Sequence, residues 1–548
     1  MPRKFFMRIL PSPFCPLLFS LLALFSCEKK SPVIHSIDPA IGILGEVLNI
    51  EGEYFGEERG ESYVSIAGVV PTASSYIEWN NTRIRLRLPE FGESGLVRVH
   101  VGARRSNALL FSNRATMPAP VEETSFGAGP RISSIEPAAA RIGSLVSITG
   151  SGFGNSREQS GVFFSWNAEN APGTLAEDMD SGFIEVFEGD LGYDLWTDRE
   201  IRVRVPDGAV SGNVEIRTAQ GTSRPVFFEV PDRPGTRTFG NKRSYTFSYS
   251  VQVQVWEAAV PNILYLWIPQ PVLSASQRNP ELLSRSMESF MENYQRTDLF
   301  RLVDMAANST VMVDQAWAVE VYAQETNLRY QQIRQDTSSP IHAAYTRADA
   351  LIPADDARIR KLAEKICGRE RNPYLKARRI YEWLLKEADI DLSGPESTGV
   401  LDALEQGHFD SYTASLLFCS LARAADVPAV PVSGVLVNQG ETIRHCWAEF
   451  WIDGFGWVPL DSALGAASAP PGFALREDAE SWYFGNLDSQ RIAFSRGWNA
   501  LSPMDPRGRT VSRNREYALQ NLWEEAVGEL KSYSSLWGDI TITGIYAY

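Results

Sequence analysis

The feature that most limits how this chain can fold is an internal repeat in its first half. Ile37–Pro39 returns as Ile135–Pro137, 98 positions later, and Ile84–Pro89 returns as Ile201–Pro206, 117 positions later. The change of offset places an insertion of 19 residues in the second copy, within residues 154–196. Because a repeat of this kind is one folded unit used twice, we expect two domains of the same architecture followed by a different one.

Both copies have the pattern of antiparallel β-sheet. Apolar and polar residues alternate over short runs that Gly, Pro and Asn interrupt, which is the period of half-buried strands. The opening Ile-x-Pro, the run Gly150–Gly154 and the strand that ends in Val-Pro resemble IPT/TIG domains, which are immunoglobulin-like modules. We predict two such sandwiches at residues 31–113 and 131–230, with a linker at 114–130. The fold leaves open whether they are binding surfaces or a spacer, and we favour a spacer.

A third domain is expected over residues 244–548. Tyr245–Val255 alternates strictly, and Ile263–Pro269 gives a second strand of similar character. Apolar residues at helical spacing then predict helices over Asp355–Cys367 and from Pro373 onward. The alternating run near the C-terminus is expected to close the sheet of the same domain. This order of strands, helices and strands predicts an α+β fold.

Within this domain, three polar residues stand in positions suited to chemistry. Ser411 opens an apolar run that predicts a helix, and His445 begins the strand pattern His-x-Trp-x-Glu. Asp453-Gly454 supplies a hairpin turn into a second strand, which ends at Asp461. We therefore expect the carboxylate of Asp461 to lie beside the imidazole of His445.

These motifs resemble the core of the transglutaminase-like superfamily, whose members carry a Cys-His-Asp triad on a fold related to papain-like cysteine proteases. The resemblance implies that Ser411 stands where the family keeps its nucleophilic cysteine, with His445 and Asp461 as the other two members. It also implies that three neighbours line the cleft: Tyr412, Trp447 and Glu449.

The exchange of thiol for hydroxyl leaves three functions open. A helix N-terminus lowers the pKa of a thiol and offers N–H groups to an oxyanion, but a hydroxyl at Ser411 would depend on His445 as general base. The domain is then an active Ser-His-Asp acyl-transfer enzyme, hydrolysing or exchanging amide or ester bonds. Alternatively, it is a non-catalytic domain that binds a peptide, protein or glycopeptide in the old cleft, which we favour, or a purely structural scaffold.

The first residues predict export. A basic start, an apolar stretch at Leu17–Phe25 and Cys27 resemble the signal peptide of bacterial lipoproteins, in which the cysteine is lipidated and becomes the new N-terminus. An ordinary signal peptide with a chance cysteine is the alternative. The preferred interpretation is a signal peptide at residues 1–27, lipidation of Cys27, and a protein held to a membrane of the bacterial cell envelope.

Composition argues against several classes of function. Lys and Arg number 52 against 67 Asp and Glu, and the net charge of −15 would repel a nucleic acid backbone, so no nucleic acid partner is expected. Three cysteines remain in the folded body, namely Cys367, Cys419 and Cys446. They form no disulfide framework and no Cys-x-x-Cys metal motif, and with five histidines they predict neither a metal nor a cofactor.

Overall fold

The computed structural model describes most of the chain from residue 30 to residue 547. The described ranges are 30–43, 45–89, 95–102, 104–113, 129–168, 181–187, 189, 191–231, 234–392, 399–513 and 515–547. Cys27, the signal peptide and most of the expected linker lie outside them. No helix within these ranges is long and apolar enough to span a membrane.

The first repeat forms a β-sandwich with its own apolar core. One sheet has the order β1 (Val33–Asp38), β3 (Val47–Glu53), β6 (Arg83–Arg87) and β5 (Tyr76–Trp79), with a short 3-10 helix η1 (Ala73–Ser75) before β5. The other has the order β2 (Ile41–Gly42), β9 (Leu109–Asn113), β7 (Gly95–Val101) and β4 (Tyr63–Ile66), with β8 (Arg104–Arg105) paired to β7. This confirms the immunoglobulin-like prediction.

The second repeat has the same architecture with one added strand. One sheet has the order β10 (Arg131–Glu136), β11 (Leu145–Ser151), β15 (Glu200–Arg204) and β14 (Tyr193–Trp196). The other has the order β13 (Ser181–Glu185), β12 (Gly161–Asn167), β16 (Gly212–Thr218) and β17 (Gly221–Thr222), with β18 (Val226–Phe228) paired to β16. The insertion follows β12, which corresponds to β4 of the first copy. It therefore supplies the extra edge strand β13.

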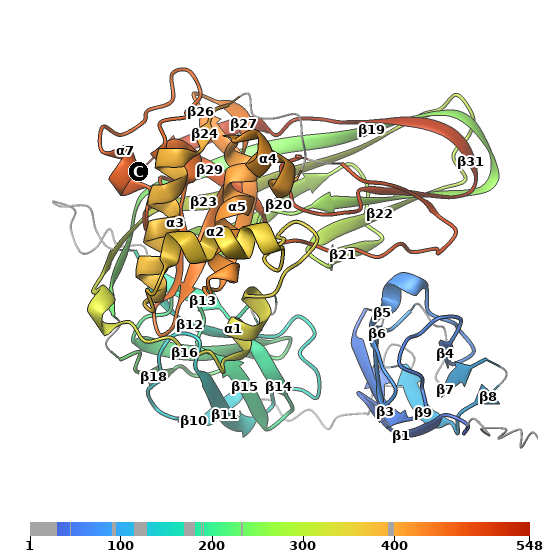
Figure 1. Ribbon diagram of the computed structural model, residues 1–548. Coiled ribbons are helices and arrows are strands. Elements are labelled where there is room, and N and C mark those ends of the chain that lie inside the picture. Colours follow the sequence, from blue (N-terminus) through green and yellow to red (C-terminus); the bar gives the residue numbers. More distant parts are fainter. Residues whose placement is uncertain are drawn as a thin grey trace, which may run out of the picture.

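A long sheet begins the third domain (Figure 1). Its strands are β20 (Gln277–Arg285), β23 (Thr310–Leu328), β19 (Gly235–Pro269), β22 (Thr297–Val303), β21 (Met291–Tyr294), β31 (Glu524–Trp537), β30 (Arg509–Val511) and β32 (Thr541–Ala547). β31 and β32 both pair with β19, as expected for a C-terminal segment that closes the sheet. β19 begins at Gly235, earlier than the boundary we placed at residue 244.

The two strands predicted at 245–255 and 263–269 are one continuous element. β19 has 35 residues, which would span about 115 Å if straight. Register shifts in its pairing with β31 occur between Val255 and Asn262 and bend it there. Buried positions accordingly change from odd numbers, such as Val253, to even numbers, such as Leu264, so both halves of β19 face one core.

Helices cover one face of a second, smaller sheet (Figure 1). The sheet has the order β28 (Gly456–Leu460), β27 (Glu441–Ile452), β26 (Ala429–Asn438) and β29 (Arg491–Arg496). The helices are α1 (Pro340–Tyr345), α2 (Ala357–Cys367), α3 (Pro373–Glu387), α4 (Val400–Gln406), α5 (Ser411–Ala424), α6 (Ser462–Gly465) and α7 (Ala479–Trp482), with η5 (Tyr330–Gln332) before α1 and a two-strand pair, β24 (Asp389–Ile390) with β25 (His408–Phe409).

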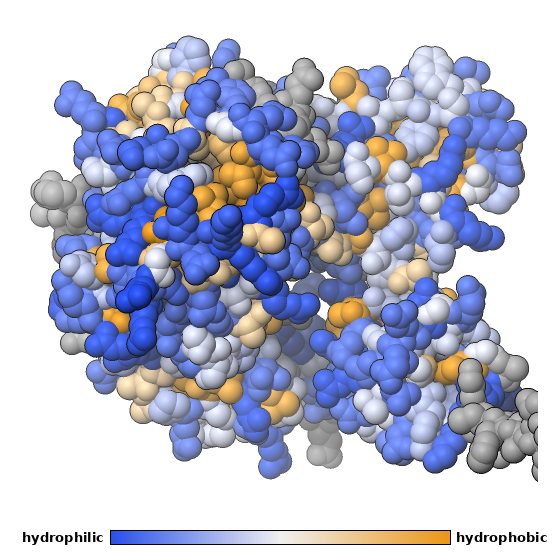
Figure 2. Space-filling view, in the orientation of Figure 1, coloured by the Kyte–Doolittle hydropathy of each residue, from blue (hydrophilic) through white to orange (hydrophobic). Residues whose placement is uncertain are grey.

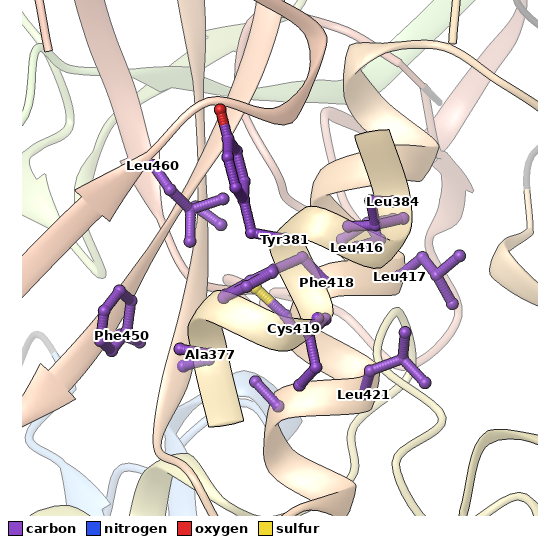
Figure 3. Close-up of a cluster of buried hydrophobic side chains, with 14 of the residues drawn as sticks. Ala377, Tyr381, Leu384, Leu416, Leu417, Phe418, Cys419, Leu421, Phe450 and Leu460 are labelled. Carbon is purple, nitrogen blue, oxygen red and sulfur yellow. The ribbon is translucent and has the colours of Figure 1, made fainter. Parts of the chain in front are cut away.

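The two helices predicted from their spacing are confirmed. Asp356 caps α2 by accepting from Arg358 N, and the helix stops at Gly368, whose φ of 57° suits glycine. Asn372 caps α3 and Pro373 occupies its first position. Apolar side chains of α3 and α5 meet those of β27 and β28 in the core drawn in Figure 3, around Tyr381, Leu416, Phe418, Phe450 and Leu460.

The second sandwich shares a hydrophobic core with the third domain. It is therefore docked against that domain, whereas a spacer would need only to be joined to it through the chain. Trp451 and Trp457 from the smaller sheet are buried against the sandwich residues. Arg237 Nη1 donates a hydrogen bond to Asp207 Oδ1 at 2.6 Å, and Arg237 Nη2 donates one to the carbonyl oxygen of Trp457 at 2.6 Å. A Cβ at Gly456 would lie 1.8 Å from Asp207 Oδ1, so this contact requires glycine. The sandwich thus holds β28, the strand that leads to Asp461.

Candidate functional site

Ser411 is the first residue of a buried helix, α5. Asp410 is its N-cap: Asp410 Oδ1 accepts from Thr413 N at 2.9 Å, and Asp410 N donates to Thr413 Oγ1 at 3.1 Å. This reciprocal capping box fixes where the helix begins. Arg515 pairs with the remaining carboxylate oxygen of Asp410. Ser411 therefore stands where the first-turn N–H groups carry partial positive charge.

The hydroxyl of Ser411 contacts the backbone next to His445. The ladder between β27 and β28 ends at the pair Ala448–Leu460, and past this end the N–H of Cys446 donates to Ser411 Oγ at 3.3 Å. Ser411 is partly exposed. Among the described residues, its hydroxyl has no hydrogen bond to the imidazole of His445.

His445 and Asp461 form the pair that the sequence predicted. His445 Nε2 lies 2.7 Å from Asp461 Oδ2, and the two residues are 3% and 0% exposed. The other carboxylate oxygen accepts from Leu464 N at 3.0 Å, because Asp461 also caps α6. An ionised carboxylate only accepts, so Nε2 carries a hydrogen, and Nδ1 is the acceptor whenever the ring is neutral.

Arg491 shares the carboxylate of Asp461 with His445. Arg491 NH1 donates to Asp461 Oδ2 at 3.0 Å, and Arg491 NH2 donates to Asp488 Oδ2 at 2.6 Å. The guanidinium also lies 4.9 Å from the centre of the Trp447 ring. One buried cation thus bridges two carboxylates directly behind the histidine.

The charges of this cluster reinforce one another. Burial alone would raise the pKa of Asp461, but the charge and hydrogen bond of His445, together with Arg491, lower it to about 2. For Arg491, burial lowers the pKa, and the charges of Asp488 and Asp461 outweigh burial and raise it. The carboxylate is therefore ionised at neutral pH, and its charge is divided between an imidazole and a guanidinium.

The three residues predicted to line the cleft have different environments. Trp447 is 3% exposed and its ring stacks near that of His445, with 6.4 Å between centroids. Tyr412 is 8% exposed, and burial raises its pKa to about 12. Glu449 Oε2 accepts a hydrogen bond from Arg496 Nε at 2.6 Å, and Glu449 lines a large cavity between the domains. Their role as ligand contacts remains a prediction.

The three cysteines of the folded body are all buried. Burial raises the pKa of the Cys419 and Cys446 thiols, to about 12 for Cys446, and raises that of Cys367 as well. None is a candidate nucleophile, because a nucleophilic cysteine needs a stabilised thiolate. Within the described ranges, no cluster of three His, Cys, Asp or Glu side chains could hold a metal ion.

Comparison with protein families places these residues in a known context. Residues 360–462, which include Ser411, His445 and Asp461, match the model of the transglutaminase-like superfamily. The chain carries a transglutaminase-like domain. Residues 32–115 and 130–168 match the IPT/TIG domain, so the immunoglobulin-like modules precede the transglutaminase-like domain as predicted.

Similar proteins match only parts of the chain. An uncharacterized protein of Haemophilus influenzae is 29% identical over 182 residues, which cover 28% of this chain and 49% of that protein. A cyclomaltodextrin glucanotransferase from a Bacillus species is 34% identical over 64 residues, or 12% of this chain and 8% of the enzyme. The chain thus spans about half of the first relative and a small part of the second.

Two solved structures also match parts of the chain. A candidate cysteine protease from Cytophaga hutchinsonii has 15% identity and a TM-score of 0.37, covering 57% of this chain and 93% of that one. The periplasmic domain of TgpA from Pseudomonas aeruginosa has 12% identity and a TM-score of 0.26, covering 44% of this chain and 92% of that one.

Sequence reasoning missed two members of the site, Arg491 and Arg515. A signal for Arg491 was present, since it opens a strand whose following residues, Ile492–Phe494, are apolar and buried. A cation that starts such a run needs a buried carboxylate partner. Arg515 follows a loop and has no comparable pattern around it.

Proposed function

We propose that this protein is a lipid-anchored component of the bacterial envelope whose transglutaminase-like domain binds a peptide or glycopeptide without chemically changing it. The observation that carries the proposal is at Ser411. A hydroxyl stands at the start of α5, where the resemblance implies a thiol; it accepts from Cys446 N, and no hydrogen bond in the described part of the chain joins it to His445. In this arrangement the alcohol is not hydrogen-bonded to the base that would have to remove its proton.

Arg491 supports the same interpretation. In a serine triad the carboxylate stabilises the imidazolium that forms when the histidine takes the proton. Here Asp461 Oδ2 also accepts a hydrogen bond from Arg491 Nη1 at 3.0 Å, so a neighbouring cation already neutralises part of the charge on the carboxylate. An imidazolium at His445 would also be repelled by this guanidinium. A serine hydroxyl needs a stronger general base than a thiolate does, whereas Arg491 weakens the support that Asp461 gives to a protonated His445.

The ligand class follows from the kind of domain. The resemblance to transglutaminase-like proteins implies a cleft at the N-terminus of α5 that receives a peptide segment. Ser411 is partly exposed at that place, whereas His445 and Asp461 behind it are buried. A ligand would therefore meet the first turn of α5, where N–H groups favour a carbonyl or a carboxylate.

An active Ser-His-Asp enzyme is the second candidate, and one observation favours it. Asp461 holds the proton on Nε2 of His445, which leaves the Nδ1 lone pair available as a base. The proton of Ser411 would pass to Nδ1 while Oγ bonds to the substrate carbonyl carbon. The imidazolium would return the proton to the leaving amine or alcohol as its bond to that carbon breaks, and water would release the acyl group by the same steps.

Attachment to a membrane through Cys27 belongs to the proposal. Cys27 follows a basic start and a short apolar stretch, the pattern of a lipidated signal. More than one acyl chain on this cysteine would give stable anchoring, since a single chain binds a bilayer only marginally.

Soluble disaccharide-peptide fragments of peptidoglycan test the proposed function. The body beginning at Glu28 would be incubated with them, and binding measured by calorimetry while mass spectrometry follows the fragments. We expect saturable binding with the fragments unchanged, and a Ser411→Ala variant that binds similarly. Cleaved or exchanged fragments that disappear with Ser411→Ala would replace this proposal by the enzymatic one, and absence of binding would refute the ligand class.

A further inference from the structure

A large cavity lies where the two sandwiches approach the long sheet. Its volume is about 1350 Å³, and its walls come from the first sandwich at Arg87, the second at Trp196, and the third domain at Gln270 and Tyr294. Figure 2 shows the surface hollowed between the first sandwich and the rest of the molecule. Pockets for drug-sized ligands are about 300–1000 Å³, so this cavity has room for a longer molecule.

The cavity shares Glu449 with the expected cleft but does not reach the start of α5. Glu449 and Arg496 form part of its wall, whereas neither Ser411 nor His445 lines it. Glu449 and Arg496 also line a small cavity that reaches Trp447. The large cavity thus reaches β27 at Glu449 without reaching Ser411 or His445.

Three aromatic side chains in the cavity wall are only partly buried. Phe290 precedes β21, Tyr345 ends α1, and Trp498 follows β29. Each comes from a different segment of the third domain; Arg301 lies 5.0 Å from the centre of the Phe290 ring, and the Tyr345 ring meets Trp457 edge-on at 5.0 Å. Flat aromatic faces accept flat C–H faces, so these rings suit a ligand built from saturated rings.

The charges of the wall nearly balance. Among the described residues, seven carboxylates and five guanidinium groups line the cavity. Glu449 and Arg496 are paired at 2.6 Å, and Asp207 is paired with Arg237. A polyanion would find no excess of opposite charge here, and a polycation only a small one. The wall instead presents ion pairs that can donate to and accept from an uncharged ligand.

Two glutamines supply unmatched hydrogen-bonding atoms. Gln324 is 5% exposed, and its Nε2 donor has no partner in the described protein. Gln295 has a buried Oε1 acceptor that also lacks one. Both residues line the cavity. A buried unmatched donor or acceptor is costly, so a ligand hydroxyl that reached either atom would remove that cost.

We propose that this cavity binds a neutral oligosaccharide. A hydroxyl both donates and accepts, so it satisfies Gln324 Nε2 and Gln295 Oε1, whereas a carboxylate only accepts and an ammonium only donates. Sugar rings supply the C–H faces for Phe290, Tyr345 and Trp498. The volume accommodates several linked rings, and the second sandwich then contributes directly to binding. This inference does not depend on the chemistry at Ser411.

Calorimetry with a set of neutral hexasaccharides, made of glucose, xylose, mannose or N-acetylglucosamine units, tests the proposal on the chain beginning at Glu28. We expect one of them to bind saturably with one site per chain. Gln324→Met should weaken that binding about ten-fold, because one hydrogen bond is lost and the side chain keeps its length. Gln252→Met is the matched control, since Gln252 is a half-buried glutamine of the same sheet that does not line the cavity.

Two further variants complete the test. Trp498→Ala should weaken binding by a similar factor through loss of stacking, and Gln324→Met carries the test alone if the tryptophan variant fails to fold. Gln324→Met should bind the disaccharide-peptide fragments as the parent does, because Gln324 lines this cavity and Ser411 does not, which separates this site from the proposed function. The proposal is wrong if no hexasaccharide binds, if Gln324→Met and Gln252→Met bind equally, or if an uncharged hexapeptide displaces the sugar from the same site.

Discussion

Restoring a thiol at Ser411 tests whether the rest of the site is intact. The substitution is Ser411→Cys. The new sulfur would lie at the first position of α5, where Cys446 N already donates to Ser411 Oγ at 3.3 Å. We expect the introduced thiol to ionise far more readily than an ordinary cysteine.

The magnitude follows from two contributions. The helix N-terminus stabilises a nearby anion by up to about 2 kcal/mol, and a hydrogen bond to a charged group contributes about 1.5–3 kcal/mol. Since 1.36 kcal/mol corresponds to one pKa unit, together they would lower the pKa by about 2.6–3.7 units from about 8.5, and partial burial returns some of this. We expect the pKa of the introduced thiol to be about 6.

Iodoacetamide labelling followed by intact mass measures this pKa. The rate should rise with a midpoint near pH 6, and the native thiols should contribute little because all three are buried with raised pKa values. Ser532→Cys is the control, as Ser532 is exposed on β31 and lies far from a helix N-terminus. Equal midpoints for the two variants would refute the active-site geometry described here.

Three further predictions concern stability and attachment. Asp461→Asn should remove most of the loss of stability that the parent shows between pH 4 and pH 2. Because folding lowers the pKa of Asp461 to about 2 from about 3.9, its carboxylate contributes about 2.5 kcal/mol of stability above pH 4, and this is lost as the pH falls towards 2. Urea unfolding of both proteins at pH 4 and pH 2 measures this, and an equal loss of stability in the two would contradict the ionised pair. Asp207→Ala should destabilise the protein by about 3–5 kcal/mol, because it leaves the buried Arg237 without its carboxylate partner. Glu229→Ala, at an exposed position of the same sandwich, is the control and should not destabilise it. Equal melting temperatures for the two variants would contradict the docking of the second sandwich. Cys27→Ala should move the protein from the membrane to the soluble fraction on cell fractionation, and unchanged sedimentation with membranes would refute lipidation at this residue.

Local patterns predicted the sandwiches, the helices and the His445–Asp461 pair. Each depends on spacing along one segment: strand alternation, helical periodicity, or the Asp453-Gly454 turn that joins β27 to β28. The insertion in the second repeat was also located, though its structure as strand β13 was not. These features could be predicted because each is set within a short stretch of chain.

Contacts between distant segments were not predictable in this way. The bend in β19 depends on its partner β31, about 270 residues later, and the sequence around Pro261 resembled a break between two strands. Arg491 reaches Asp461 only after β29 pairs with β26. The burial of Trp457 against the second sandwich depends on a glycine, Gly456, whose importance is visible only when Asp207 is in place.

The most direct test of the central claim is covalent labelling by a fluorophosphonate, measured by intact mass on the body beginning at Glu28. Wild type would be compared with Ser411→Ala and His445→Ala under conditions that label an ordinary serine hydrolase. If the hydroxyl of Ser411 lacks an engaged base, no adduct forms in any of the three proteins. An adduct in the wild type that both substitutions abolish would show an activated serine and would contradict the account of a binding domain.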